Sequence, residues 1–171
     1  MAAPAADGCM GDFMTYDYAA PPTVDRDPQE LTVPLRGATF GEAVKRFFQN
    51  YFVAAGRASQ SEYWWALLLV MLVALAAGAL AGMSSAFGDG AGAGVFLVLA
   101  VILMLGLLAV AFGTIGLTIR RLHDANQSGW WYLALFIVNL IPVLGLLSIV
   151  GAIVIGVLKS DPAGARFDAQ P

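Results

Sequence analysis

The run VFLVLAVILMLGLLAVAFGTIGLTI, residues 95–119, decides the fold class, because its 25 residues include no charged side chain. About 20 apolar residues are enough for an α-helix to cross the hydrocarbon core of a bilayer. Two other uncharged runs cover residues 64–83 and 130–158. None of the three has the one-sided apolar periodicity of a helix on the surface of a soluble core. The sequence therefore predicts an all-α integral membrane protein.

The composition of the 171-residue chain supports a membrane setting. Hydrophobic residues make up 59% of it and charged residues only 12%, about half the charged fraction of a typical soluble domain. The charge is uneven, since residues 1–30 carry six acids and one base, whereas residues 31–171 carry eight Lys and Arg against six Asp and Glu. Neither part has the basic patch that nucleic-acid binding needs. Cys9 is the only cysteine, which excludes an intrachain disulfide.

The chain before the first apolar run divides into a tail and a short amphipathic helix. Residues 1–37, rich in Ala, Pro and Asp, predict a disordered acidic tail, and residues 38–167 a membrane domain followed by a second short tail at 168–171. Thr39 and Glu42 are spaced as a capping box, and the aromatic residues that follow fall on one face of a helix. We expect this N-terminal helix to be interfacial, with its apolar face on the lipid, against the bundle, or both.

Local signals place the predicted membrane spans at about 62–83, 95–119 and 130–158. A second capping box and a row of Tyr and Trp residues mark the start of the first span at Glu62. The third run would measure about 43 Å as one helix, against about 30 Å for the hydrocarbon core, and Pro142 interrupts it. It is therefore one kinked helix or two short helices in a hairpin, and the small bundle has three to four transmembrane helices.

The distribution of basic residues predicts the orientation of the chain. Lys and Arg favour the cytoplasmic side of a membrane. Basic residues precede the first span, follow the second and occur in the C-terminal tail, whereas the glycine-rich loop between the first two spans has none. The sequence thus predicts a multi-pass protein of the bacterial cytoplasmic, or inner, membrane with a cytoplasmic N-terminus.

This topology brings two motifs to the cytoplasmic surface, GRASQSEYWW at 56–65 and RRLHDANQSGWW at 120–131. Part of the pattern has a structural explanation, because arginines at a helix C-terminus and a tryptophan belt are common at membrane interfaces. Arginines also bind anionic lipid headgroups and phosphates. The candidate residues for binding such a ligand or a partner are Arg57, Glu62, Trp64, Arg120, Arg121, His123, Asp124 and Trp130.

The leading hypothesis is a non-enzymatic protein whose charged cluster binds anionic membrane lipid or a membrane-protein partner, a second copy of the chain included. No cofactor or metal is expected, because His123 stands without the other ligands of a metal site. A small transporter or channel subunit is an alternative, although the spans hold no ionisable residue for ion coupling. An enzyme on lipid-linked substrates, with His123 and Asp124 as an acid–base pair, is the other alternative.

The two motifs, the glycine-rich loop between them and LIPVLG at 140–145 together resemble the domain of unknown function 805 family. Members of that family are small multi-pass proteins of the bacterial inner membrane. The resemblance extends over about Phe40–Phe167 and implies that the motif residues are the family's signature positions, without naming a reaction. The chain departs from the family pattern at Gln60, where a basic residue is usual, and in its C-terminal GARFD, where Ala165 and Asp168 replace the usual residues.

Overall fold

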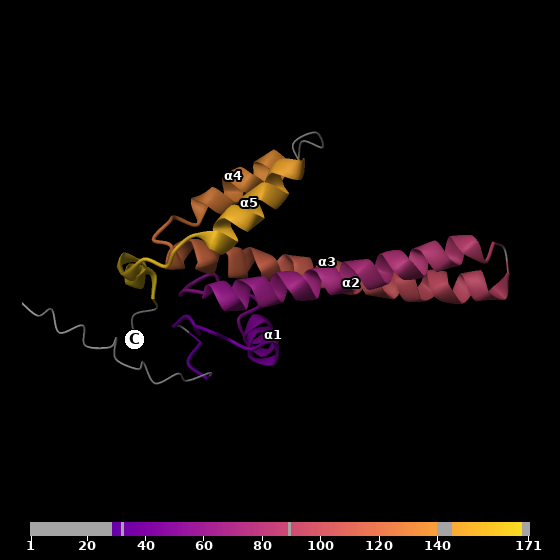
Figure 1. Cartoon of the computed structure of the whole chain (residues 1–171), viewed down its shortest axis with the longest axis horizontal. Coiled ribbons are helices and arrows are strands. Elements are labelled where there is room, and N and C mark those ends of the chain that lie inside the picture. The colour runs from indigo at the N-terminus through magenta and orange to yellow at the C-terminus, as the bar shows by residue number, and fades with distance from the viewer. Residues whose placement is uncertain (1–28, 32, 89, 140–144, 169–171) are drawn as a thin grey trace, which may run out of the picture.

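The computed structural model describes residues 29–31, 33–88, 90–139 and 145–168, and the regular structure in these ranges is entirely helical. Figure 1 shows two long helices side by side, with the shorter elements gathered toward one end of the pair. The all-helical prediction is therefore confirmed for the described residues. The elements are α1 (Phe40–Gln49), α2 (Gln60–Ala86), α3 (Ala91–Asp124), α4 (Trp130–Asn139), α5 (Gly145–Val157) and the 3-10 helix η2 (Pro162–Phe167).

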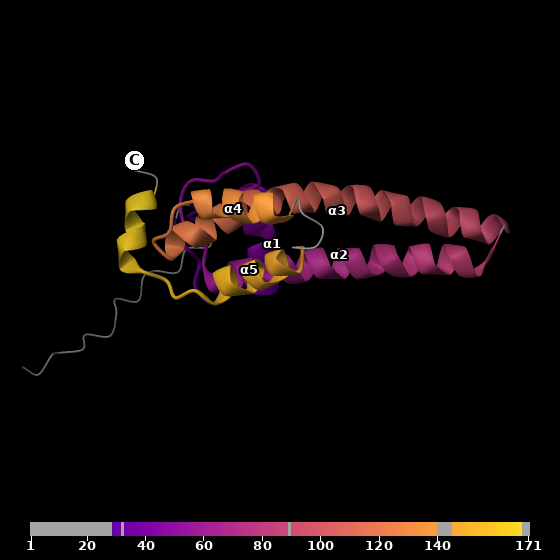
Figure 2. The same ribbon diagram turned by 90° about the horizontal axis from the view of Figure 1, so that it is seen from above.

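The two longest elements, α2 and α3, form a hairpin whose helices lie side by side (Figures 1 and 2). Ser59 and Glu62 form the predicted capping box at the start of α2. The helices have 27 and 34 residues and measure about 40 and 51 Å. Both are long and apolar enough to cross a membrane. Large apolar side chains are exposed along both helices, which is the pattern of a lipid-facing surface.

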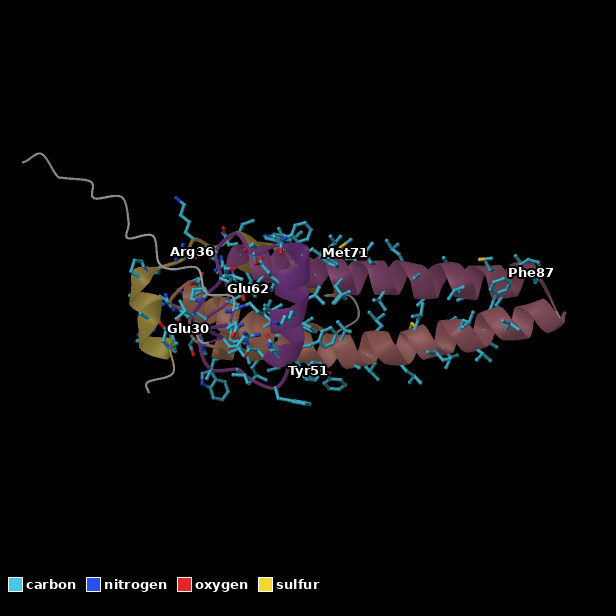
Figure 3. The ribbon with its side chains drawn as sticks, turned by 90° about the horizontal axis from the view of Figure 1, so that it is seen from below. Glu30, Arg36, Tyr51, Glu62, Met71 and Phe87 are labelled. Carbon is cyan, nitrogen blue, oxygen red and sulfur yellow. The ribbon has the colours of Figure 1, made fainter. Side chains whose placement is uncertain are left out.

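Helix α1 begins at the predicted capping box of Thr39 and Glu42 and lies across α2 and α3 (Figure 3). Phe47 is buried against α3 at Gly113, where a Cβ atom would lie only 2.6 Å from the phenyl ring. Glycine at this position therefore allows the two helices to approach. Phe48 is 53% exposed, so one part of the aromatic face packs on the hairpin and another part faces outward.

The long apolar run at 130–158 forms two short helices, α4 and α5, as the hairpin alternative requires, and Pro142 itself lies outside the described residues. The helices pack against each other, with Leu135 so close to Gly151 that a Cβ there would lie 2.6 Å from the leucine side chain (Figures 1 and 2). They have 10 and 13 residues and measure about 15 and 20 Å. Each is thus shorter than the hydrocarbon core of about 30 Å.

Residues 33–38, which we call the N-terminal segment and which include the last residues of the predicted tail, are held by the start of α2. Leu35 is only 4% exposed. Its amide donates to Glu62 at 3.1 Å, and its carbonyl accepts from the Ser59 hydroxyl at 2.6 Å. The segment is ordered because its backbone supplies partners to buried polar groups, which local composition does not reveal. Residues 1–28 of the predicted tail lie outside the described residues.

Replacing Gly113 with Leu tests the docking of α1. The added side chain would overlap the rings of Phe47 and Tyr51, so we expect a cost of about 1–3 kcal/mol and separation of α1 from α3. The unfolding temperature in detergent should fall, and limited proteolysis should cut between α1 and α2 more readily. Gly106→Leu is the matched control, because in the described structure no atom lies within 4 Å of a Cβ at that position. Equal behaviour of the two variants would contradict this packing.

Candidate functional site

The charged residues of the described chain gather at one end of the α2–α3 hairpin, which we call the charged end. Within the described residues, α2 after Glu62 and α3 before Arg120 carry no charge. Figure 3 shows Glu30 and Arg36 at this end and Phe87 at the other. Four parts of the chain meet here, namely the N-terminal segment with α1, the start of α2, the end of α3 and the residues after α5.

A salt bridge between Arg46 and Glu62 lies in the interior of the charged end. Arg46 Nε lies 2.5 Å from Glu62 Oε1, and the two side chains are 2% and 4% exposed. The other guanidinium nitrogens donate to the carbonyls of Glu30 and Val33, each at 2.7 Å. The second carboxylate oxygen accepts from the Leu35 amide. Buried ion pairs need such additional hydrogen bonds to offset their desolvation, and this pair joins α1, α2 and the N-terminal segment.

A second buried salt bridge holds the chain that follows α5. Arg121 NH1 lies 2.6 Å from Asp124 Oδ2, and both side chains are fully buried. Arg121 also donates to the Leu158 carbonyl, and the Ser160 hydroxyl donates to Asp124. The amide of Asp161 donates to the Asp124 carbonyl at 2.8 Å. These contacts fix the residues after α5 on the end of α3.

Arg57 extends this network to the last described residue. Its guanidinium donates two hydrogen bonds of 2.7 Å to Asp168 and lies 4.0 Å from Asp124. The hydrogen bonds that Arg57 donates to Asp168 raise the pKa of the guanidinium above its ordinary value, although partial burial acts in the opposite direction. Asp168 is one of the positions at which the chain departs from the family pattern. The departure therefore places an acid opposite Arg57.

The single histidine packs between the end of α3 and η2. His123 Nδ1 donates to the Gly56 carbonyl at 3.2 Å, and the imidazole stacks on Phe167 with ring centroids 4.2 Å apart and planes 6° apart. The Arg166 guanidinium lies 4.6 Å from the centroid of the Phe167 ring. At Gly164 a Cβ atom would lie 2.4 Å from the His123 carbonyl oxygen, so only glycine allows this approach. These contacts give His123 a role in docking η2.

Arg120 is buried differently from the other arginines of the charged end. It is 2% exposed, and its Nε atom has no hydrogen-bond partner in the part of the chain that the structure describes. Glu62 is near enough to attract the guanidinium electrostatically, and Arg46 is near enough to repel it. The Arg120 carbonyl accepts from the Ala58 amide at 3.1 Å. That hydrogen bond holds the connection between α1 and α2 on α3.

The structure brings only part of the predicted cluster into one network. Arg57, Arg121 and Asp124 share contacts, whereas Glu62 forms a separate salt bridge with Arg46. Residues of the charged end that the sequence prediction did not include are Arg46, Ser160, Phe167 and Asp168. The sequence did carry one signal for Asp168, since it stands at a position of the GARFD motif where the chain departs from the pattern of the family it resembles.

The two predicted tryptophans lie at the surface of the charged end. Trp130 is 76% exposed at the start of α4. Trp64 is 41% exposed and packs on α5 at Gly156, where a Cβ atom would lie 2.5 Å from the indole. The exposed basic residues of the same end include Lys45, Lys159 and Arg166. The charged end thus has both buried salt bridges and exposed aromatic and basic side chains.

The described residues of this end line two pockets of different character. One, of about 360 Å³, lies beside His123 and includes Ser128 and Trp130 in its wall. Another, of about 240 Å³, lies between α4 and α5 and is almost wholly apolar. Among the residues that the structure describes, no group of three or more His, Cys, Asp or Glu side chains is placed to hold a metal ion.

The described chain is all-helical, with two helices long and apolar enough to cross a membrane and the charged residues collected at one end. A family model matches the chain over residues 51–169. The chain belongs to that family, which is described as Protein of unknown function (DUF805). The resemblance of the two sequence motifs to this family is thereby confirmed.

Relatives from Escherichia coli (strain K12) have names that give the same setting. Inner membrane protein YhaH is 33% identical over 129 residues, which cover 74% of this chain and 93% of that relative. Inner membrane protein YhaI is 35% identical over 89 residues, which cover 52% of this chain and 66% of that relative. No solved structure matches the chain. The chain is accordingly an inner-membrane protein of the DUF805 family.

Replacing Glu62 with Gln tests the buried salt bridge with Arg46. The substitution keeps the size of the side chain and leaves the guanidinium charge buried and uncompensated. We expect a loss of about 3–5 kcal/mol in the free energy of unfolding, measured by thermal or denaturant unfolding in detergent. Glu42→Gln changes the equivalent residue of the other capping box, which is more exposed, and should cost much less. Equal losses in the two variants would contradict the role of the pair.

Proposed function

We propose that this chain is a multi-pass inner-membrane protein whose charged end lies at the cytoplasmic surface and binds anionic phospholipid headgroups without catalysing a reaction. One observation carries the proposal. The charged groups of the described chain lie at one end, where two buried salt bridges, Arg46–Glu62 and Arg121–Asp124, occupy the interior and basic groups remain at the surface beside exposed tryptophans. This pattern suits contact with a negatively charged leaflet.

The proposed topology has α2 and α3 crossing the bilayer. The α4–α5 hairpin enters from the cytoplasmic side and returns to it, because each helix is only about half to two-thirds as long as the hydrocarbon core is thick. Eight Lys and Arg residues belong to the described chain, all at the charged end, which the positive-inside rule places in the cytoplasm. The names of the relatives support the choice of the inner membrane.

The proposed binding surface has two layers. The inner layer consists of the salt bridges of Arg46, Arg57 and Arg121, which hold the segments in place. The outer layer offers Lys159 directly after α5 and Arg166 on η2, whose guanidinium lies over the Phe167 ring. Each exposed basic residue near an anionic leaflet contributes about 1 kcal/mol of attraction. The inner layer thus sets the position of the outer cations, which make the contact with lipid.

Accessibility of single cysteines tests the topology. In a Cys9→Ser background, we expect Cys at Gln127 and Ala163 to react with an impermeant maleimide only after the membrane is opened. Cys at Ser85, at the far end of α2, should react in intact spheroplasts. Reaction of the Ala163 site together with the Ser85 site would mean that the chain after α5 lies outside, which would sink the proposed hairpin.

Removing the exposed charges of Lys159 and Arg166 tests headgroup binding. The double variant Lys159→Gln, Arg166→Gln should lose about tenfold or more of the preference for phosphatidylglycerol over phosphatidylcholine, since about 1 kcal/mol is expected from each residue. Native mass spectrometry of protein from mixed vesicles reports both lipids directly. The matched control, Lys159→Arg with Arg166→Lys, keeps the charge and should keep the preference. An unmodified protein with no preference between the two lipids would overturn the proposal.

A further inference from the structure

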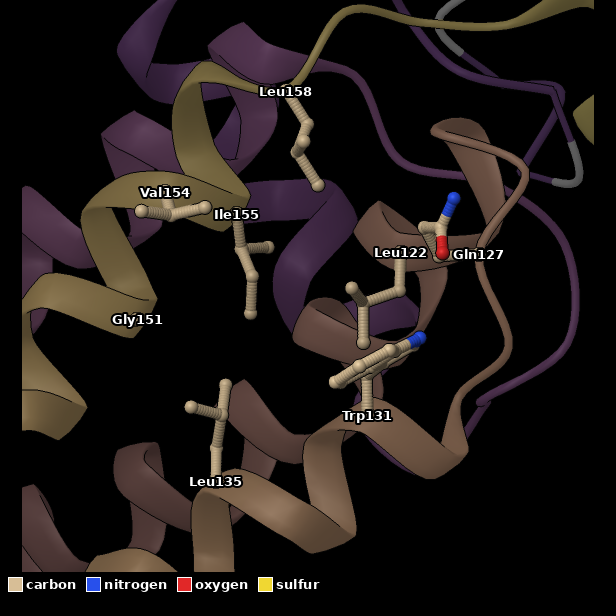
Figure 4. A pocket seen from close by; sticks show the side chains of 8 residues that line it. All are labelled: Leu122, Gln127, Trp131, Leu135, Gly151, Val154, Ile155 and Leu158. Atoms are coloured by element: carbon tan, nitrogen blue, oxygen red, sulfur yellow. The ribbon is translucent and has the colours of Figure 1, made fainter.

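The pocket between α4 and α5 has no role in the charged network. Its volume is about 240 Å³, and side chains from three helices and the two connections beside them line it (Figure 4). Seven of the eight lining residues are apolar, and Gln127, at one edge of the set in Figure 4, is the exception. The lining residues are Leu122, Gln127, Trp131, Leu135, Gly151, Val154, Ile155 and Leu158.

The charged end holds the walls of this pocket in place. Leu122 is 2% exposed and precedes Asp124, whose salt bridge fixes the end of α3. Leu158 is held through its carbonyl, which accepts from Arg121 and from Gln60, the latter at 2.8 Å. Arg121 therefore joins the α3 side of the pocket to the residue that follows α5, through its hydrogen bond to the Leu158 carbonyl.

We propose that this pocket holds one acyl chain of a phospholipid from the surrounding bilayer. Water is a poor occupant, because a buried water needs two to four polar partners and the lining offers one polar side chain. The outer faces of α4 and α5 expose Phe136 and Ile153, so acyl chains are the solvent next to the opening. This inference rests on the proposed function, which is lipid binding. It adds that the protein holds one acyl chain of the lipid.

The polar groups at one edge of the pocket suit the headgroup end of such a lipid. Trp131, in the first turn of α4, is 59% exposed and lies where the amphipathic belt of a membrane protein is expected. Gln127 places an amide in the lining, and the exposed Lys159 directly follows the lining residue Leu158. A headgroup and its ester oxygens can therefore lie at this edge while the chain enters between the helices.

The volume fits part of one chain. The volume of about 240 Å³ is below the roughly 300–1,000 Å³ of pockets that hold a drug-sized ligand, so the pocket accommodates only part of one acyl chain. That is the part of an acyl chain nearest to the glycerol, and it agrees with the short length of α4. The remainder of the chain would continue into the bilayer beside the hairpin.

Phospholipids with a photoactivatable diazirine near the glycerol end of one acyl chain test the proposal. The full chain is placed in vesicles that carry either a phosphatidylcholine or a phosphatidylglycerol probe, irradiated and mapped by peptide mass spectrometry. We expect both probes to label the peptides that contain Leu135 and Gly151 more strongly than the exposed middle of α2. Val154→Trp fills the pocket and should reduce this labelling several-fold.

Ile153→Trp is the matched control, because Ile153 is similarly exposed, neighbours Val154 on α5 and does not line the pocket. It should leave the labelling unchanged, and Val154→Phe provides a smaller filling if the tryptophan variant does not fold. Equal labelling in Val154→Trp and Ile153→Trp would overturn the proposal. Cross-links from this site to residues 1–28 or to a second copy of the chain would overturn it as well, by naming a different occupant.

The failure of this inference is distinguishable from that of the proposed headgroup contact. Labelling of the pocket by both probes with no preference for phosphatidylglycerol would remove the headgroup proposal and support the acyl-chain site. A preference for phosphatidylglycerol with an unlabelled pocket would keep the headgroup proposal and overturn the acyl-chain site.

Discussion

The buried salt bridge between Arg46 and Glu62 is the interaction on which the arrangement of the charged end depends. Each charge costs several kcal/mol to remove from water, and their attraction offsets this only when hydrogen bonds satisfy the remaining donors and acceptors. Those hydrogen bonds come from the backbone of Glu30, Val33 and Leu35. The salt bridge therefore fixes α1, α2 and the N-terminal segment together, since the loss of any one leaves a buried charge without a partner.

Salt bridges determine the arrangement of the charged end because contacts between apolar helices give little driving force for association in a bilayer. Between helices in a bilayer, lipid tails are as apolar as leucine, so burying leucine against leucine gives little driving force, and close packing and polar contacts decide the arrangement. Both close packing and polar contacts occur in this protein. Small residues such as Gly113 and Gly151 let helices approach, and the Arg121–Asp124 pair binds the chain after α5 to α3. The middle of the α2–α3 hairpin, without charges, is left exposed to lipid along most of its length.

The features that the sequence predicted are those with local causes. The uncharged runs predicted α2 and α3, and the capping boxes at Thr39 and Ser59 predicted where two helices begin, because a capping box involves residues only three apart. The partners of the site residues were not predictable in this way. Arg57 and Asp168 are 111 residues apart, and no local pattern joins them. The choice between one kinked helix and two short ones likewise depended on packing, in particular that of Leu135 on Gly151.

The short α4–α5 hairpin connects the charged end to the lipid. The two helices measure only about 15 and 20 Å, and the start of α4 and the end of α5 both lie beside the end of α3. Trp131 in the first turn of α4 and Leu158 directly after α5 both line the apolar pocket, and Lys159 is the next residue. Arg121, which is paired with Asp124, also donates to the Leu158 carbonyl. It therefore positions both one lining residue of the pocket and the Lys159 cation that follows it. On the proposed lipid contact, this coupling is the physical reason why buried charges that touch no lipid determine where the lipid is held.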